Sequence, residues 1–193
     1  MSRLICCGFA TFCCLLALVG CGRKVEVVSP DTSIHLSGMW NDDDSRSVSQ
    51  AMINQCVGAA WIGDFRERTG RKPIVRVSQI VNASKEDIAT QIFTNDLERA
   101  LINSATVRVV ASRDEAAIQR EERADVQANS QEAPASQNEQ APDFFLQGSI
   151  RIQHDSHEKN QVKFYQVDLK MVDSTTNESV WIGTDERKKV VED

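Results

Sequence analysis

The spacing of hydrophobic and polar residues predicts three helices in the first two-thirds of the chain. Behind an acidic cluster at residues 42–45, apolar side chains recur at helical spacing as far as about Arg68. A second helical pattern follows a predicted capping box at residues 84–87 and ends near Asn103. Residues 112–115 predict the cap of a third helix, which extends to residue 127 and whose mixed charges are typical of a solvated surface.

Runs of continuous or alternating apolar residues predict five strands. Residues 74–81 are apolar on both faces, as in a central strand, and residues 107–111 form a short strand. Three further strands are predicted at residues 144–152, 165–171 and 180–191. In the first two of these, apolar and polar side chains alternate, so that the two kinds face opposite ways.

Polar composition predicts how these elements are connected. Residues 127–142 are rich in Ala, Ser, Gln, Asn and Pro, which predicts a loop, and residues 154–160 and 175–178 predict the two turns of a C-terminal meander. Phe164 has the opposite parity to Tyr165, and a bulge near Phe164 would reconcile the two patterns. The order of elements predicts an α/β fold with a mixed sheet of about five strands flanked by helices.

The first 20 residues have the profile of an export signal. A single basic residue, Arg3, precedes an uncharged apolar stretch from Leu4 to Val19. This stretch is shorter than the roughly 20 apolar residues that a membrane-spanning helix needs. We therefore expect residues 1–20 to direct export and then to be removed.

The segment Leu18-Val19-Gly20-Cys21 looks like a bacterial lipobox, in which the cysteine receives diacylglycerol before cleavage. Lipid on Cys21 would anchor the mature protein to a membrane without spanning it. Gly22 stands where the pattern for inner-membrane retention has an aspartate, which favours the outer membrane, with the domain facing the periplasm. Residues 21–33 are then a lipid-anchored spacer, and residues 34–193 form one domain.

Removal of the signal would leave one free thiol. Four of the six cysteines lie within the signal and Cys21 takes the lipid, so only Cys56 remains and no intramolecular disulfide can form. Cys56 lies in the apolar helical pattern, which favours a buried side chain over a reactive thiol. The mature chain would lose Arg3 from 22 basic residues and none of its 28 acidic ones, a net charge of −7, which speaks against nucleic acid as a partner.

No sequence motif points to catalysis or a cofactor. The mature chain contains no G-x-S-x-G, no G-x-x-x-x-G-K-[ST], no H-E-x-x-H and no C-x-x-C. Residues 154–158 combine two histidines with acidic residues, but a polar turn is more often solvated than metal-binding, and we expect no metal site. The basic run at residues 187–189 is interpreted as protection of an edge strand.

One group of polar residues is a candidate contact patch for a partner. It lies at the start of the first predicted helix and comprises Trp40, Asn41, Asp42, Asp44 and Arg46. A structural role is the favoured alternative, in which the polar residues cap the helix and the tryptophan folds over the core.

Several blocks of the domain resemble one family, the LpoB-like lipoproteins. The blocks begin at Ser37-Gly38-Met39-Trp40-Asn41-Asp42 and continue with residues 93–101, 107–113, 145–150, 163–169 and 178–183. Together they span roughly residues 36–191. The resemblance implies a fold similar to the N-terminal domain of TolB and to part of the curli secretion lipoprotein CsgG.

The resemblance also implies a function. Such a protein is an outer-membrane lipoprotein that binds a bifunctional penicillin-binding protein and stimulates its glycosyltransferase and transpeptidase activities, with no catalytic residues of its own. An alternative hypothesis is a structural component of a CsgG-like envelope assembly or secretion complex, and an enzyme is the third. Two features depart from the family: the spacer is short, and Pro134 and Pro142 interrupt a segment that is usually helical.

Overall fold

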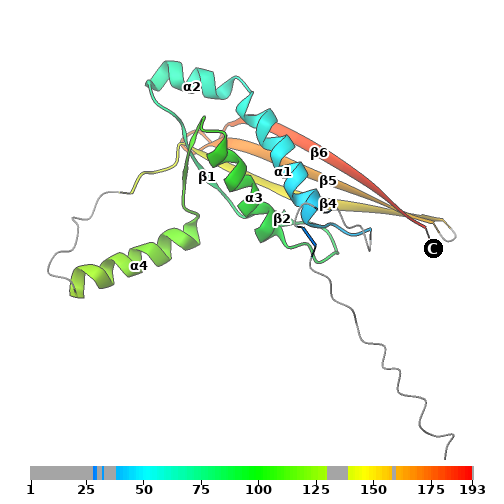
Figure 1. Cartoon of the computed structure of the whole chain (residues 1–193). Coiled ribbons are helices and arrows are strands. Elements are labelled where there is room, and N and C mark those ends of the chain that lie inside the picture. Colours follow the sequence, from blue (N-terminus) through cyan, green and yellow to red (C-terminus); the bar gives the residue numbers. More distant parts are fainter. Residues whose placement is uncertain (1–27, 30–31, 33–37, 130–138, 158–159, 193) are drawn as a thin grey trace, which may run out of the picture. The chain divides into compact units, whose positions relative to one another are not determined.

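Figure 1 presents a computed structural model of the chain, which divides into two units, Met1–Thr32 and Ser33–Asp193. The residues that the structure describes are 28–29, 32, 38–129, 139–157 and 160–192. In the first unit, the backbone N–H of Thr32 donates to the carbonyl oxygen of Ser29 at 2.9 Å. The predicted signal and Cys21 lie outside the described residues, as does part of the predicted 127–142 loop.

The described part of the second unit is built on a six-stranded mixed sheet in the order β3-β1-β4-β5-β6, with β2 paired to β4. The strands on one side of β4 are parallel to their neighbours, and β4, β5 and β6 form an antiparallel meander. The strands are β1 Ile74–Val77, β2 Val81–Asn82, β3 Arg108–Val110, β4 Phe144–His157, β5 Asn160–Asp173 and β6 Ser179–Glu192. The predicted α/β fold with a mixed sheet is therefore confirmed.

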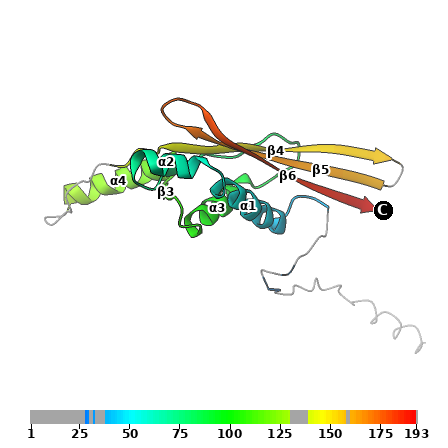
Figure 2. The same cartoon turned by 90° about the horizontal axis from the view of Figure 1, so that it is seen from above.

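Within the described residues, four helices accompany the sheet: α1 Asp42–Val57, α2 Trp61–Thr69, α3 Thr90–Asn103 and α4 Arg113–Asn129. Helices α1 and α3 pack against each other on one face of the sheet, which we call the covered face (Figures 1 and 2). No helix in the described part of the chain lies over the opposite face, which we call the open face (Figure 2). None of the described helices is long and apolar enough to cross a membrane.

The hydrophobic core lies between the covered face and helices α1 and α3. Alternation along β5 directs Tyr165, Val167 and Leu169 into this layer, and all three side chains are buried. From the helices, Met52 of α1 and Phe93 of α3 are fully buried against them. Burial on one face only explains why apolar and polar side chains alternate along the strands of the meander.

The first predicted helix is two helices in the structure, because the chain turns at Gly58. The backbone N–H of Gly58 donates to the carbonyl oxygen of Asn54 at 3.2 Å and ends α1. The turn brings Trp61 into the core, where its Nε1 donates to the carbonyl oxygen of Cys56 at 2.9 Å. The Trp61 ring lies 4.9 Å from the ring of Phe144, centroid to centroid. Tertiary packing therefore overrides a helical spacing that runs through the break.

The predicted 74–81 strand is interrupted as well. Four residue steps from Val77 to Val81 face only three steps on β4, from Leu146 to Ser149. The extra residue displaces the segment between β1 and β2 from regular pairing, as in a bulge. Ile80 turns into the core, whereas Val81 is exposed.

One predicted capping box is wrong and one predicted cap is confirmed. Ser84 closes a local turn instead, because its Oγ donates to Asn82 Oδ1 at 2.6 Å and α3 starts only at Thr90, without a side-chain cap. At the start of α4, the N–H of Ser112 donates to Glu115 Oε2 at 3.0 Å, and the N–H of Glu115 donates to Ser112 Oγ at 3.4 Å. This reciprocal pair is a capping box.

The bulge predicted near Phe164 is also wrong. The pairing of β5 with β4 and with β6 is regular through Phe164, and the register shift lies between Met171 and Val172. Phe164 therefore belongs to the open face, and its neighbour Lys163 belongs to the covered face. The same regular pairing carries β4 on to His157, so that most of the predicted 154–160 turn is strand.

Candidate functional site

Trp40, the first residue of the predicted contact patch, packs against the core. Its ring packs edge-on against Phe93 at 6.0 Å and lies 5.6 Å from the ring of Tyr165, centroid to centroid. Its Nε1 donates to Ser45 Oγ at 2.7 Å. Trp40 is partly buried, and its indole N–H already has an acceptor, so the structure supports the role in which this side chain folds over the core.

Asn41 and Asp44 form the cap of α1. The N–H of Asp44 donates to Asn41 Oδ1 at 3.0 Å, and the N–H of Asn41 donates to Asp44 Oδ2 at 2.9 Å. This capping box satisfies two backbone donors that the helix start would otherwise leave without a partner. The helix-capping role that the sequence favoured for these two residues is confirmed.

Asp42 and Arg46 differ from the rest of the patch because their side chains are 70% and 42% exposed. Arg46 Nη2 lies 3.0 Å from Asp42 Oδ2, one helical turn away, and 3.6 Å from Asp43 Oδ1. An exposed pair of this kind contributes little to stability. Three residues of the predicted patch therefore have structural roles. Contact of Asp42 and Arg46 with a partner stays a prediction.

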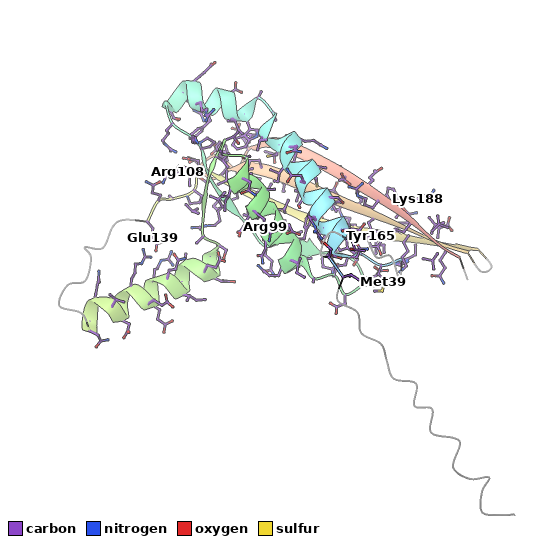
Figure 3. The ribbon with its side chains drawn as sticks, viewed as in Figure 1. Met39, Arg99, Arg108, Glu139, Tyr165 and Lys188 are labelled. Atoms are coloured by element: carbon purple, nitrogen blue, oxygen red, sulfur yellow. The ribbon has the colours of Figure 1, made fainter. Side chains whose placement is uncertain are left out.

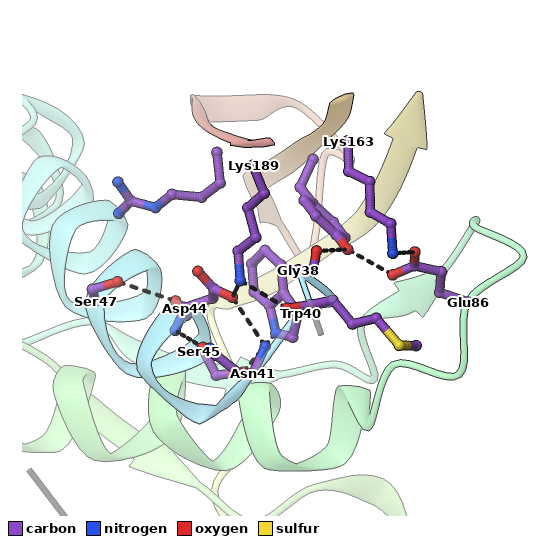
Figure 4. Close-up of polar contacts among 12 residues, drawn as sticks. Gly38, Trp40, Asn41, Asp44, Ser45, Ser47, Glu86, Lys163 and Lys189 are labelled. Atoms are coloured by element: carbon purple, nitrogen blue, oxygen red, sulfur yellow. Dashed lines mark hydrogen bonds and ion pairs between the residues drawn. The ribbon is translucent and has the colours of Figure 1, made fainter. Parts of the chain in front are cut away.

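The carboxylate of Asp44 has a second role, in a buried ion pair with Lys189 of β6. The two side chains are 8% and 12% exposed, and Lys189 Nζ also donates to the carbonyl oxygen of Met39 at 2.7 Å (Figure 4). The pair ties the start of α1 to the last strand, although the residues are 145 positions apart. Lys189 was interpreted as edge protection; its buried ion pair shows a structural role instead.

A matching ion pair joins Glu86, in the loop before α3, to β5. Lys163 Nζ lies 2.8 Å from Glu86 Oε1, and the Tyr165 hydroxyl donates to Glu86 Oε2 at 2.6 Å (Figure 4). The same hydroxyl lies 3.3 Å from the carbonyl oxygen of Gly38. Lys163 is the register partner of Lys189, and two lysines directly opposite each other are unfavourable unless each has its own carboxylate.

The surroundings of Glu86 and Tyr165 shift both pKa values. Burial alone would raise the pKa of Glu86, but the hydrogen bonds from Lys163 and Tyr165 hold it below its ordinary value. Burial, together with donation to Glu86, raises the pKa of Tyr165. Glu86 is therefore ionised and Tyr165 protonated near neutral pH, which is the arrangement that a structural hydrogen bond needs.

We expect glutamine in place of Glu86 to flatten the acid side of the stability profile. The folded pKa of Glu86 lies below its ordinary 4.5, so its ionised form stabilises the fold at neutral pH, and this contribution is lost as the pH falls through the folded pKa. Urea unfolding of both proteins between pH 7 and about pH 3 measures the slope. Part of the slope should remain, because Arg71 also lowers the pKa of Asp143. Identical slopes would contradict the assignment.

These two ion pairs lie where residues 38–40 lead into α1 and fix this segment against the sheet. Gly38, Met39 and Trp40 contact side chains of β5 and β6, and Met39 and Tyr165 lie near each other at the start of α1 (Figure 3). The raised pKa of the Tyr165 hydroxyl keeps it protonated beside Glu86, which suits a structural hydrogen bond and not nucleophilic attack. The arrangement of the two ion pairs fixes the segment that leads from the predicted spacer into the fold.

Elsewhere among the described residues, no arrangement typical of catalysis occurs. Burial raises the pKa of the Cys56 thiol to about 12, opposed only in part by the hydrogen bond with Trp61, so the thiol is inert at neutral pH. No group of three or more possible metal ligands occurs within the described part of the chain. In the histidine-containing segment 154–158, His154 and Asp155 are exposed on β4. The side chains of residues 156–158 lie outside the described part of the structure.

The open face of the sheet carries a polar network around Asp168 of β5. Arg151 of β4 donates to Asp168 Oδ2 at 2.8 Å, and Thr184 of β6 donates to Asp168 Oδ1 at 2.9 Å. Gln166 Nε2 donates to Asp168 Oδ1 at 2.9 Å from the same strand. The network spans all three strands of the meander and fixes the orientation of its side chains on this face.

A hollow of about 500 Å³ lies beside this network. Asp168, Gln147 and Ser149 belong to its polar lining, and Val81 and Ile182 add apolar side chains that are 59% and 68% exposed. Large apolar side chains at the rim of a hollow in an uncovered sheet face are typical of a protein contact surface. The open face is thus the second candidate site, after the predicted patch.

Comparison with protein families decides the identity of the domain. A family model described as peptidoglycan-synthase activator LpoB matches residues 44–186. The chain belongs to the LpoB family. This family is one of regulatory activators rather than enzymes, and its members are associated with the cell envelope and with penicillin-binding proteins. A search of curated proteins finds no match to this chain.

Solved structures similar to this LpoB-family chain include LpoB itself. The C-terminal domain of LpoB from Salmonella enterica is 12% identical, with 75% of this chain and 98% of that chain covered and a TM-score of 0.45. LpoB from Escherichia coli, solved by NMR, is 13% identical, with 92% and 87% covered and a TM-score of 0.43. Lipoprotein GNA1162 from Neisseria meningitidis is 13% identical, with 61% and 83% covered and a TM-score of 0.39.

Sequence reasoning did not identify the residues that form the two buried ion pairs or the polar network of the open face. Lys163 and Lys189 were not recognised as buried, although each occupies a position whose parity places it on the covered face. A charged residue on the covered face of a sheet indicates a buried ion pair, and the parity of the two lysines could have been read from the sequence. The partners Asp44 and Glu86, in contrast, lie far away along the chain. Asp168 was predicted only as a residue of a polar face.

Proposed function

We propose that this protein is an outer-membrane lipoprotein, anchored through a lipid on Cys21, that binds and stimulates a bifunctional penicillin-binding protein. The family match over residues 44–186 carries this proposal, because it runs from the first turn of α1 into β6. The match therefore includes the helices and almost the whole sheet rather than a local motif. The lipobox ending at Cys21 supports the anchor.

We further propose that the protein acts by binding and not by catalysis. In support, Cys56 is buried with a raised pKa, and the clustered charged groups Asp44, Glu86, Lys163 and Lys189 are engaged in ion pairs with each other. A regulator of this kind stimulates its partner by binding the active conformation more tightly than the inactive one. Its effect then depends on a surface, and the rate-determining chemistry stays in the synthase.

The surface that we propose for the synthase is the open face around Asp168 and Ile182. Helices α1 and α3 occupy the covered face, whereas the open face combines exposed apolar side chains with a polar network of fixed geometry (Figure 2). Protein interfaces gain most of their affinity from a few apolar or aromatic anchors surrounded by polar groups. Ile182, which is 68% exposed beside the hollow, is the strongest candidate for such an anchor.

Crosslinked envelopes offer the test of this proposal in cells. The full-length lipoprotein with a C-terminal tag should enrich a bifunctional penicillin-binding protein and carry acyl mass on its N-terminal peptide. The Cys21→Ser variant should lose the acyl mass, leave the membrane fraction and enrich less of the synthase. Absence of any penicillin-binding protein from the wild-type eluate would refute the activator role. A large homo-oligomeric ring in detergent would favour the assembly component instead.

A further inference from the structure

A separate hollow of about 460 Å³ lies where the parallel strands β1 and β3 end. It is lined by Ser78 at the end of β1, by Glu98 of α3 and by the first turn of α4 from Ser112 to Glu115. In α/β sheets, ligands commonly bind in the crevice at the carboxyl ends of parallel strands. The volume also falls within the roughly 300–1,000 Å³ of small-molecule sites.

Arg76 supplies a positive charge to this hollow. Its Nε donates to the carbonyl oxygen of Ala111 at 3.0 Å, which fixes the guanidinium between β1 and the start of α4. Among the described residues, no acceptor pairs with the remaining N–H groups of Arg76. A half-buried guanidinium held by one edge presents the other edge for two parallel hydrogen bonds, the geometry that suits a carboxylate.

Glu98 supplies a negative charge to the same hollow. Within the described part of the chain, its carboxylate has neither a hydrogen bond nor an ion pair, and it does not pair with Arg76. Burial and the nearby carboxylate of Glu115 raise the pKa of Glu98. A cation bound beside Glu98 would offset both effects, so this side chain is a ready acceptor for an ammonium group.

We propose that this hollow binds a small zwitterion, an amino acid or a short peptide, whose carboxylate contacts Arg76 and whose ammonium contacts Glu98. The two charges line one hollow without neutralising each other, which is the arrangement that a ligand with both charges needs. Arg113, Asp114 and Glu115 line the same hollow, so a ligand with a single charge would meet like charges as well as opposite ones. Recognition therefore requires both ends of the ligand, and this site is independent of the proposed synthase contact.

Binding to the purified full-length mature lipoprotein in detergent micelles tests this site. Calorimetry should give saturable binding of alanine or of alanyl-alanine, with a dissociation constant of about 1 mM or tighter. Comparison of the dissociation constants of the two probes shows whether the site prefers an amino acid or a dipeptide. N-acetyl-alanyl-alanine lacks the ammonium and alanyl-alanine amide lacks the carboxylate, so each should bind at least tenfold more weakly.

The Glu98→Gln variant supplies the matching test on the protein side. It removes a charge that burial and Glu115 disfavour, so the variant should fold, and it should bind the better zwitterion at least tenfold more weakly. Glu121→Gln changes the same charge on the exposed surface of α4 and should bind as the wild type does. The proposal fails if neither zwitterion saturates by about 10 mM. It also fails if a blocked probe binds equally well, or if Glu98→Gln has no effect.

Discussion

The Asp44→Ala variant should lose about 3–5 kcal/mol of the free energy of unfolding, the loss typical of breaking one side of a buried ion pair. Alanine removes the acceptor of Lys189 and leaves an ammonium group that is only 12% exposed without its carboxylate. It also removes the side-chain half of the capping box with Asn41, which adds about 1 kcal/mol. Urea unfolding followed by tryptophan fluorescence measures the change, since Trp40 packs beside this cluster.

Two further variants separate the ion pair from a general effect of charge at the start of α1. Asp42→Ala removes a carboxylate that is 70% exposed and should change the free energy of unfolding by less than about 1 kcal/mol. Asp44→Asn/Lys189→Met removes both charges and should recover part of the loss, because no ammonium is then left buried and unpaired. Equal losses for Asp42→Ala and Asp44→Ala would contradict the account of this cluster.

The Ile182→Glu variant should weaken binding of the synthase by about 30-fold or more, the effect expected for the loss of a hot-spot residue. The substitution replaces an exposed apolar anchor with a charge that the interface would have to desolvate. The fold should tolerate it, since Ile182 lies on the edge strand β6 and its register partner on β5 is Lys170. Titration of the purified synthase with wild-type and variant lipoprotein measures the affinity.

The matched control lies on the other side of the domain. Ile102 of α3 is 58% exposed, and Ile102→Glu makes the same chemical change away from the open face. This variant should bind the synthase as tightly as the wild type. If both variants bind normally, the open face is not the contact surface; if Ile102→Glu alone loses binding, the contact lies on the helices instead.

Local patterns in the sequence predicted the elements that depend on local physics. Alternation at Tyr165, Val167 and Leu169 identified a strand with one buried face, and the capping group at Ser112 identified the start of α4. The core role preferred for Trp40 and the capping role of Asn41 follow from the same short-range reasoning. The caps hold because neighbours along the chain supply the interacting groups, whereas Trp40 also packs against Phe93 and Tyr165, which are distant in the sequence.

Features that depend on distant residues could not be predicted in this way. The break before Trp61 is stabilised by packing on Phe144. The ion pair of Asp44 with Lys189 joins two residues that are 145 positions apart along the chain. The bulge was misplaced because the apolar residue Phe164 was assumed to be buried. In the structure it lies on the open face, where the sheet is not covered by a helix.

The rate of glycan-strand synthesis by the purified bifunctional penicillin-binding protein from the same bacterium, with and without the lipoprotein, tests the central claim most directly. With lipid II as substrate, the wild-type protein should raise the rate in a saturable manner. The Ile182→Glu variant should need a far higher concentration to reach the same rate. A synthase rate that stays constant over the whole titration with correctly folded, acylated lipoprotein would contradict the proposed function.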